Sequence, residues 1–152
     1  MRLALTAAAL LLSTPALSNE AKVGEPAPSF ELKDVEGNLV KLADFKGKPL
    51  VIEWYNPGCP FVKRAHQAGG ILENMAAEQV KSGVSWVAVN SGAPGKQGHG
   101  VAVNKESATT WNLSHPILMD EDGLVGKAYG AITTPQLFVV NADGLVVYSG
   151  AV

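Results

Sequence analysis

Cysteine is almost absent from this sequence. The 152 residues include a single cysteine, Cys59, so the chain cannot form a disulfide bond with itself and has no cysteine cluster for a structural zinc ion. The three histidines, His66, His99 and His115, are scattered without metal-ligand spacing. We therefore expect no metal and no other cofactor, and we expect His66, the histidine nearest to Cys59, to be a surface residue.

Charge is also scarce. Charged side chains make up 17% of the sequence, against about a quarter in a typical globular domain. The 12 basic and 14 acidic residues nearly balance, which leaves no positive excess with which to bind nucleic acid. A length of 152 residues suits one domain, and a hydrophobic share of 47% argues against disorder.

The start of the chain accounts for part of this shortage of charge. Arg2 is the only charged residue in the segment 1–18, an uncharged apolar run covers 3–12, and small residues stand at the −3 and −1 positions of a cleavage site after Ser18. This pattern predicts a secretory signal peptide over residues 1–18. Its apolar run is shorter than the roughly 20 residues that span a membrane. We therefore expect an exported protein, periplasmic or secreted, whose domain occupies residues 19–152 and is not inserted in the membrane after cleavage.

The rest of the chain alternates between strand-like and helix-like patterns. A hairpin over 29–42 comes first, and the run 50–55, apolar except for Glu53, predicts a strand between two helix layers. Helices are expected over 60–81 and 101–111 and in a short segment ending at Tyr129, and strands over 84–89, 117–119, 135–140 and 145–148. This order predicts one α/β domain with a central mixed β-sheet flanked by helices and an N-terminal β-hairpin.

Cys59 lies between the strand 50–55 and the helix that begins at Pro60. Proline fits the first position of a helix, because its missing N–H has no partner there in any case. The helix dipole and the free N–H groups at this end favour the thiolate, and Lys63 adds positive potential. A free cysteine is most often an inert core residue, but a turn formed by Gly58 and two prolines does not suit a core position. We interpret Cys59 as a reactive thiol, with Lys63 stabilising its thiolate.

These features together resemble the thioredoxin fold, and more closely its peroxiredoxin-like, or redoxin, branch. The corner around Cys59 and the Thr134-Pro135 pair before the strand 136–140 resemble the active-site region of that fold. The segments 23–30 and 45–49 resemble the opening of the redoxin branch and its lead into the first central strand. The resemblance extends over about residues 23–150 and implies a thioredoxin-like fold.

The resemblance also implies roles for individual residues. Cys59 matches the nucleophilic first cysteine of the C-x-x-C motif, and Val62 occupies the place of the second. Glu53 matches the buried acid that relays protons, although a strand residue that reaches solvent is an equally good interpretation. Pro135 matches the cis-proline that faces the sulfur and helps to bind the substrate backbone. The substrate-binding residues are expected to be Pro135, Thr134, Pro60 and Trp54.

The end of the sequence departs from the thioredoxin fold. Domains of this fold normally add a final helix over the sheet, whereas this chain stops at Val152, directly after the last hairpin. We therefore expect the C-terminal helix to be missing. Either the fold ends early, or the sequence is a fragment and a resolving cysteine lies further on.

The function implied is that of a thiol-based oxidoreductase that acts on disulfides or oxidised thiols in redox homeostasis. Because Val62 is not a thiol, Cys59 needs an external thiol or reductant to release its mixed disulfide. A one-cysteine peroxidase, in which peroxide converts Cys59 to a sulfenic acid, is one alternative. Asn56 in place of the peroxiredoxin threonine, and the absence of arginine after Arg64, argue against it. A non-enzymatic thioredoxin-fold binding module is the other alternative.

Overall fold

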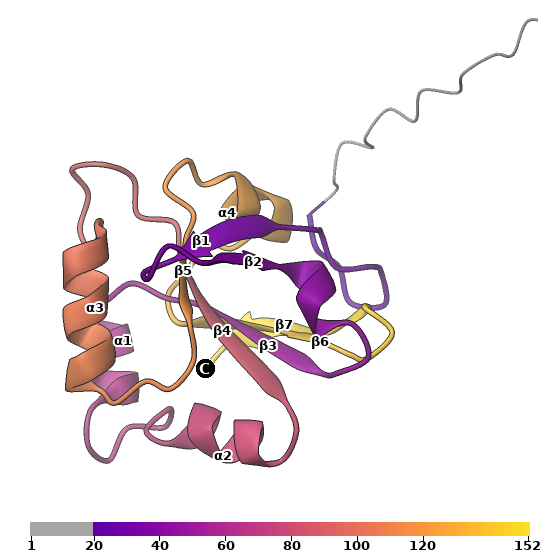
Figure 1. The fold of residues 1–152 in the computed structure, drawn as a ribbon, viewed down its shortest axis with the longest axis horizontal. Helices are drawn as coiled ribbons and strands as arrows, with labels where there is room; N and C mark the ends of the chain where they lie inside the picture. Colours follow the sequence, from indigo (N-terminus) through magenta and orange to yellow (C-terminus); the bar gives the residue numbers. More distant parts are fainter. Residues whose placement is uncertain (1–19) are drawn as a thin grey trace, which may run out of the picture.

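A seven-stranded mixed sheet forms the centre of the computed structural model, which describes residues 20–152 (Figure 1). The strands lie in the order β2-β1-β5-β4-β3-β6-β7. The predicted signal peptide over residues 1–18 lies outside the described residues. The strands are β1 (Glu31–Asp34), β2 (Leu39–Lys41), β3 (Leu50–Trp54), β4 (Ser85–Asn90), β5 (Ile117–Met119), β6 (Gln136–Val140) and β7 (Val146–Ala151). The helices are η1 (Leu42–Phe45), α1 (Pro60–His66), α2 (Met75–Lys81), α3 (Val101–Thr110) and α4 (Leu124–Tyr129).

Strand β3 is buried along its whole length, as its apolar sequence predicts. It pairs in parallel with β4 and antiparallel with β6, so both of its edges are hydrogen-bonded. Because successive side chains of a strand point to opposite faces, Ile52 and Trp54 pack into one hydrophobic cluster and Val51 into another.

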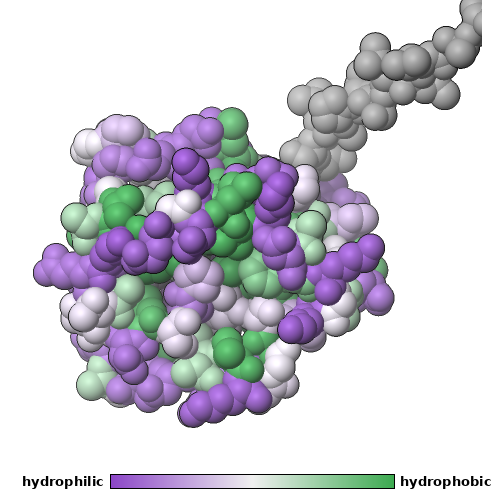
Figure 2. Space-filling view, viewed as in Figure 1, coloured by the Kyte–Doolittle hydropathy of each residue, from purple (hydrophilic) through white to green (hydrophobic). Residues whose placement is uncertain are grey.

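The helices divide between the two faces of the sheet (Figure 1). Residues of α1, α2 and α3 pack on the face that carries Val51 and Tyr55. Residues of α4 and η1 pack on the opposite face, around Trp54 and Phe138. The fold class predicted from the sequence, a mixed sheet flanked by helices with an N-terminal hairpin, is confirmed. On the side shown in Figure 2, hydrophobic and hydrophilic side chains are interspersed over the surface.

The prediction of one helix over 60–81 is wrong in its middle part. Helix α1 ends at His66, and α2 begins only at Met75. The backbone folds back in between, where the N–H of Leu72 donates to the carbonyl of Ala65 at 2.8 Å. A Cβ atom at Gly70 would collide with the carbonyl oxygen of Ala65. Only glycine therefore fits at position 70 when the backbone folds back in this way.

The remaining boundaries agree with the sequence pattern to within a few residues. Helix α3 and strand β5 match the predicted 101–111 and 117–119. The final strand β7 lies at one edge of the sheet and extends to Ala151, and no helix follows it in the part of the chain that the structure describes. None of the helices within residues 20–152 is long and apolar enough to cross a membrane.

Candidate functional site

The corner between β3 and α1 places Cys59 at the N-cap of the helix, with Pro60 at the first helical position. The backbone of Cys59 is extended (φ −70°, ψ 126°), and its carbonyl accepts the N–H of Lys63 at 3.0 Å. The side chain of Asn56 shapes the turn before it, because its Oδ1 accepts the N–H of Gly58 at 2.8 Å. The position of Cys59 at the helix N-terminus is therefore the one that the sequence indicates.

The thiol of Cys59 faces the loop that precedes β6. Its Sγ donates to the carbonyl oxygen of Thr134 at 3.2 Å, and the peptide bond between Thr134 and Pro135 is cis. Cys59 is half-buried, so a reagent from solvent can reach it. The structure thus brings together the predicted nucleophile and two of the predicted substrate-binding residues.

The surroundings of Cys59 shift its pKa in opposite directions. Burial raises the pKa, whereas hydrogen bonds from the side chain of Thr134 and from the backbone N–H groups of Val62 and Phe61 lower it. The net result is a pKa below the ordinary value of a thiol. The two N–H groups belong to the first turn of α1, where backbone donors have no partner within the helix. A lowered pKa increases the share of nucleophilic thiolate at neutral pH.

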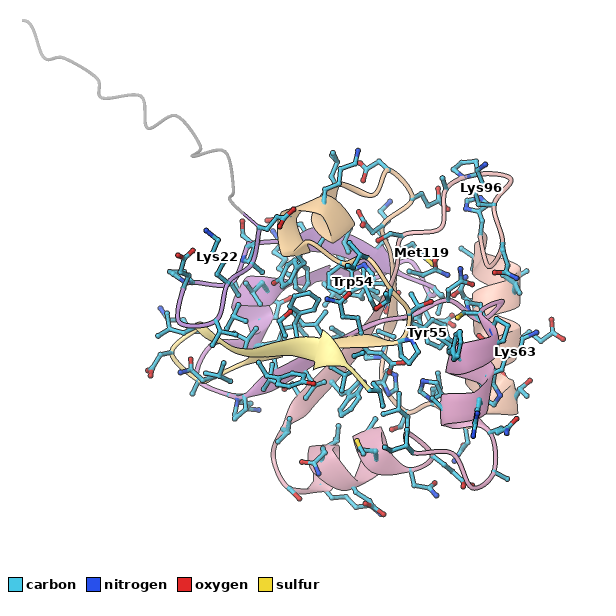
Figure 3. The ribbon with its side chains drawn as sticks, turned by 180° about the vertical axis from the view of Figure 1, so that it is seen from behind. Lys22, Trp54, Tyr55, Lys63, Lys96 and Met119 are labelled. Atoms are coloured by element: carbon cyan, nitrogen blue, oxygen red, sulfur yellow. The ribbon has the colours of Figure 1, made fainter. Side chains whose placement is uncertain are left out.

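The other predicted residues around the sulfur differ in their placement. Pro60 is exposed next to Cys59. Lys63 is exposed at the periphery of the molecule (Figure 3) and is not among the groups that lower the pKa of Cys59. Its role in stabilising the thiolate stays a prediction. Trp54 lies in the interior on the opposite face of the sheet from α1.

Glu53 is completely buried on the α1 side of the sheet, so its interpretation as a strand residue that reaches solvent is wrong. Its Oε1 lies 2.7 Å from Nε2 of His66, and its Oε2 accepts the indole N–H of Trp86 at 3.4 Å. A buried carboxylate requires such partners.

The expectation that His66 lies at the surface is also wrong, because only 4% of this residue is exposed. His66 follows the fully buried Val62 by four residues, and this spacing places both on the helix face that packs against the sheet. The sequence held a usable signal for this pair. A single acid in an apolar strand needs a buried partner, and His66 lies on the buried face of the next helix.

A second histidine is buried near this pair. His115 is 7% exposed and its ring lies 6.0 Å from that of Trp86. Neither ring nitrogen has a hydrogen-bond partner among residues 20–152. Burial, followed by the charge of His66, lowers the pKa of His115 to about 4, so this ring is neutral at pH 7. Among residues 20–152, no group of three or more His, Cys, Asp or Glu side chains is placed to hold a metal ion.

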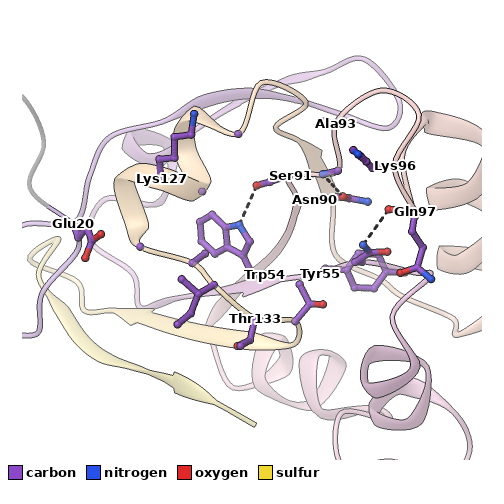
Figure 4. Close-up of a pocket in the computed structure, with 18 residues that line it drawn as sticks. Glu20, Trp54, Tyr55, Asn90, Ser91, Ala93, Lys96, Gln97, Lys127 and Thr133 are labelled. Carbon is purple, nitrogen blue, oxygen red and sulfur yellow. Dashed lines mark hydrogen bonds between the residues drawn. The ribbon is translucent and has the colours of Figure 1, made fainter.

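A groove of about 780 Å³ begins at Thr134 and runs between α4 and the loop that follows β4 (Figure 4). Its wall is fixed by a chain of hydrogen bonds. The indole N–H of Trp54 donates to Oγ of Ser91 at 3.1 Å, and this hydroxyl donates to Oδ2 of Asp120 at 2.6 Å. Asp120 also accepts the backbone N–H groups of Val125 and Gly126 in α4. The resemblance to the redoxin branch predicts Trp54 in the substrate site but does not predict this groove.

The loop over residues 91–100 is held against the Cys59 corner by amide side chains. Nδ2 of Asn56 donates to the carbonyl of Gln97 at 3.1 Å, and Nδ2 of Asn90 donates to the carbonyl of Gly98 at 2.8 Å. A Cβ atom at Gly98 would collide with the side chain of Asn56. Asn56 therefore shapes both the turn before Cys59 and the loop that forms one wall of the groove.

Comparison with known proteins identifies the family. The model of the Redoxin family matches residues 22–152. The chain belongs to the Redoxin family. This confirms the resemblance to the redoxin branch that the sequence motifs indicated, and this redoxin has the thioredoxin-like fold of its structural neighbours.

Curated relatives of the redoxin include thiol-disulfide oxidoreductases. ResA of Geobacillus thermodenitrificans is 30% identical over 125 residues, which are 82% of this chain and 66% of that protein. ResA of Bacillus subtilis is 29% identical over 124 residues, 82% of this chain and 64% of that protein. The redoxin therefore spans about two thirds of the length of these relatives.

Solved structures give the same fold. An uncharacterised conserved protein from Geobacillus kaustophilus superposes with a TM-score of 0.76 at 35% identity, covering 92% of this chain and 75% of that one. The thioredoxin domain of a thiol-disulfide oxidoreductase from Bacteroides vulgatus superposes with a TM-score of 0.69 at 19% identity, covering 86% and 89%. The second similarity shows the fold alone.

The pKa of Cys59 can be measured from the pH dependence of its alkylation by iodoacetamide, because no other cysteine competes. We expect a midpoint below about 8.5, the ordinary value of a thiol. Thr134→Val removes the hydroxyl that lowers this pKa, so it should raise the midpoint and slow alkylation at pH 7. Thr133→Val is the matched control, because that hydroxyl faces Oε1 of Gln136. Identical midpoints for the wild type and Thr134→Val would contradict the assignment.

The buried pair of Glu53 and His66 makes a prediction about stability. His66→Leu leaves Oε1 of Glu53 without its partner, so we expect a loss of about 3–5 kcal/mol in the free energy of unfolding, measured with urea. The double variant Glu53→Leu/His66→Leu should lose less than the sum of the two single variants. His99→Leu, at a ring with 25% of its side chain exposed, is the control and should cost below about 1 kcal/mol. Strictly additive losses would show that the pair is not coupled.

Proposed function

We propose that this redoxin is an exported thiol-disulfide oxidoreductase in which Cys59 acts as a single nucleophile on disulfides or oxidised thiols. The observation that carries the proposal is the half-buried Cys59 thiol, whose pKa is lowered at the N-terminus of α1 and which faces Thr134 and Pro135. The name of the ResA relatives, thiol-disulfide oxidoreductase, supports the same reaction class.

The reaction proceeds by thiol–disulfide exchange. The thiolate of Cys59 attacks one sulfur of a disulfide, so one S–S bond forms as another breaks, and the departing thiolate takes up a proton. Val62 is fully buried at the position of a second active-site cysteine, and it has no sulfur with which to attack the new bond. An external thiol must therefore attack the mixed disulfide and regenerate Cys59.

The neighbouring residues take the following roles in this proposal. Thr134 and Pro135 bind the backbone of the disulfide partner beside the sulfur. Glu53 serves as the buried acid that relays protons, with His66 and Trp86 as its hydrogen-bond partners. No cofactor and no nucleic acid takes part.

We expect glutathione disulfide to modify Cys59 in the purified protein, seen in the intact mass as one glutathionyl group that Cys59→Ser does not acquire. Val62→Cys offers a sharper test. The backbone N–H of Val62 contacts the sulfur of Cys59, so a thiol at this position is close enough to displace the adduct and form an intrachain disulfide. The adduct should persist in the wild type until a thiol is added, and it should disappear spontaneously in Val62→Cys.

Hydrogen peroxide separates the competing functions. Rapid formation of a sulfenic acid at Cys59, with turnover when a thiol is supplied, would overturn the proposal in favour of a one-cysteine peroxidase. If Cys59 reacts with neither the disulfide nor the peroxide, both thiol-based functions are excluded, and the non-enzymatic thioredoxin-fold binding module is the remaining function.

Export is tested by expressing the full chain in a Gram-negative bacterium. We expect the protein in the periplasm with Asn19 as its first residue, identified by the mass of the purified protein. Leu10→Arg places a charge in the apolar run and should keep the uncleaved chain in the cytoplasm, because a signal peptide requires an uncharged core. Leu10→Ile is the control and should be exported normally. An uncleaved wild-type chain in the cytoplasm would refute the signal peptide.

A further inference from the structure

The groove beside Thr134 has the size of a small-molecule site. Its volume of about 780 Å³ lies within the roughly 300–1,000 Å³ of typical ligand pockets. Thr134 belongs to its lining, and the carbonyl of the same residue accepts the thiol of Cys59 at 3.2 Å. Cys59 itself is outside the lining. The groove therefore reaches the residue whose carbonyl contacts the sulfur, while Cys59 itself stays outside it.

The charged groups that line the groove are mostly positive. Lys96 comes from the loop after β4 and Lys127 from α4, on opposite sides of Ser91 (Figure 4). Within residues 20–152, neither lysine forms an ion pair, whereas Lys41 and Lys105 each lie within 3 Å of a glutamate oxygen. Both groove lysines are exposed and free to bind an anion from solution.

Two carboxylates belong to the groove or to its supporting wall. Glu20 lines the groove at its α4 end. Asp120 lies behind Ser91 and is 1% exposed, and it accepts hydrogen bonds from Ser91 and from the backbone of Val125 and Gly126. The charge of Asp120 is thus compensated within the protein, and a ligand meets two cations and one anion.

Glycines keep the α4 side of the groove open. Gly123, Gly126 and Gly130 all belong to the lining. A Cβ atom at Gly126 would lie 2.8 Å from Oγ of Ser91, which would displace the hydroxyl at the centre of the wall. The close approach of α4 to Ser91 in this wall therefore depends on the absence of a side chain at Gly126.

We propose that this groove binds a small peptide thiol with two carboxylates, of the glutathione class, and holds its sulfur beside Cys59. The proposal rests on the proposed function, because a single thiol needs an external thiol to regenerate it. The size of the groove excludes a folded protein as its occupant. Lys96 and Lys127 provide one cation for each carboxylate, and Glu20 provides a partner for the ammonium group of such a peptide.

The chemistry is a reversible exchange. The thiolate of Cys59 attacks the glutathionyl sulfur of a mixed disulfide between glutathione and another thiol, that disulfide bond breaks, and the other thiolate leaves and is protonated. In the second step, the thiolate of a free glutathione attacks the sulfur of the glutathionyl group on Cys59, which releases the Cys59 thiolate and oxidised glutathione. The net reaction converts the mixed disulfide and one glutathione into a free thiol and oxidised glutathione, and the first step alone occurs when oxidised glutathione is the disulfide supplied.

The test compares two disulfides at low ionic strength, oxidised glutathione and the uncharged hydroxyethyl disulfide. The second-order rate constant of Cys59 is measured for each with the wild type and with Lys96→Gln/Lys127→Gln. We expect the double variant to lose about tenfold with oxidised glutathione, equivalent to about 1.4 kcal/mol, and to react with hydroxyethyl disulfide at the wild-type rate. Lys46→Gln/Lys48→Gln removes the same charge away from the groove and should leave both rate constants unchanged.

Equilibrium binding provides a readout that needs no reaction. S-methylglutathione, which cannot form a disulfide, should bind the wild type in calorimetry and bind Lys96→Gln/Lys127→Gln about tenfold more weakly. Added salt should weaken binding to the wild type, because it screens exposed charges.

The outcomes separate the two proposals. If oxidised glutathione reacts at the same rate with the wild type and Lys96→Gln/Lys127→Gln, or if S-methylglutathione does not bind, the groove proposal fails while the monothiol function stands. If a protein disulfide reacts much faster than oxidised glutathione in both forms, the substrate is a protein and the groove proposal also fails. If Cys59 reacts with no disulfide at all, both proposals fail.

Discussion

The pairing of β3 with β6 sets the geometry on which the site depends. Trp54, the last residue of β3, is paired with Gln136, the first residue of β6, and the two strands are antiparallel. The chain therefore leaves β3 toward Cys59 at the same end of the sheet at which it enters β6 from Thr134 and Pro135. Register across this ladder brings together residues 75 positions apart. A shift of one residue would move the carbonyl of Thr134 away from the sulfur and would turn every side chain of β6 to the other face.

Strand β3 separates two buried hydrogen-bonded networks, one around Glu53 and one around Asp120. Glu53 points to the α1 side, where His66 and Trp86 satisfy its carboxylate without access to solvent. Trp54 points to the opposite side and is linked through Ser91 to a second buried acid, Asp120. Each acid is compensated by donors from several segments of the chain. Both acids are thus held by hydrogen bonds inside the fold, and the charged side chains that line the groove are Lys96, Lys127 and Glu20.

The sequence predicted the features that depend on local pattern. Alternation and apolar runs located every strand, and Pro60 located the start of α1. A kink at Gly69-Gly70 could be predicted, but the full break between α1 and α2 could not. It depends on the close approach of Gly70 to the carbonyl of Ala65, a contact between residues that a continuous helix would keep apart. The burial of His66 was not predicted from periodicity, because one or two turns of α1 identify a buried face poorly; the lone acid in β3 was the remaining signal. Hydrophobic periodicity is informative only over longer segments.

The groove could not be predicted from the sequence, for a different reason. Its walls come from the end of β3, the loop after β4 and the segment around α4, and their proximity depends on the order of the strands rather than on any local motif. Asn56 illustrates the difficulty. In the sequence it stands in a predicted turn and in place of a peroxiredoxin threonine. In the fold it also binds the carbonyl of Gln97 and so holds the loop after β4 against this turn.

The lack of a second thiol at Val62 changes which part of the site determines specificity. In an exchange enzyme with two thiols, the internal attack on the mixed disulfide competes with every external reaction, so the partner need only dock briefly. Val62 is buried against Tyr55 and Ala88, and under the proposed function the mixed disulfide of Cys59 lasts until an outside thiol reaches it. Both the forward and the releasing step of that proposed reaction then depend on which thiols can bind next to the sulfur. The proposed function therefore makes the charge and shape of the surface around Thr134, rather than the reactivity of Cys59 alone, the determinant of its partners.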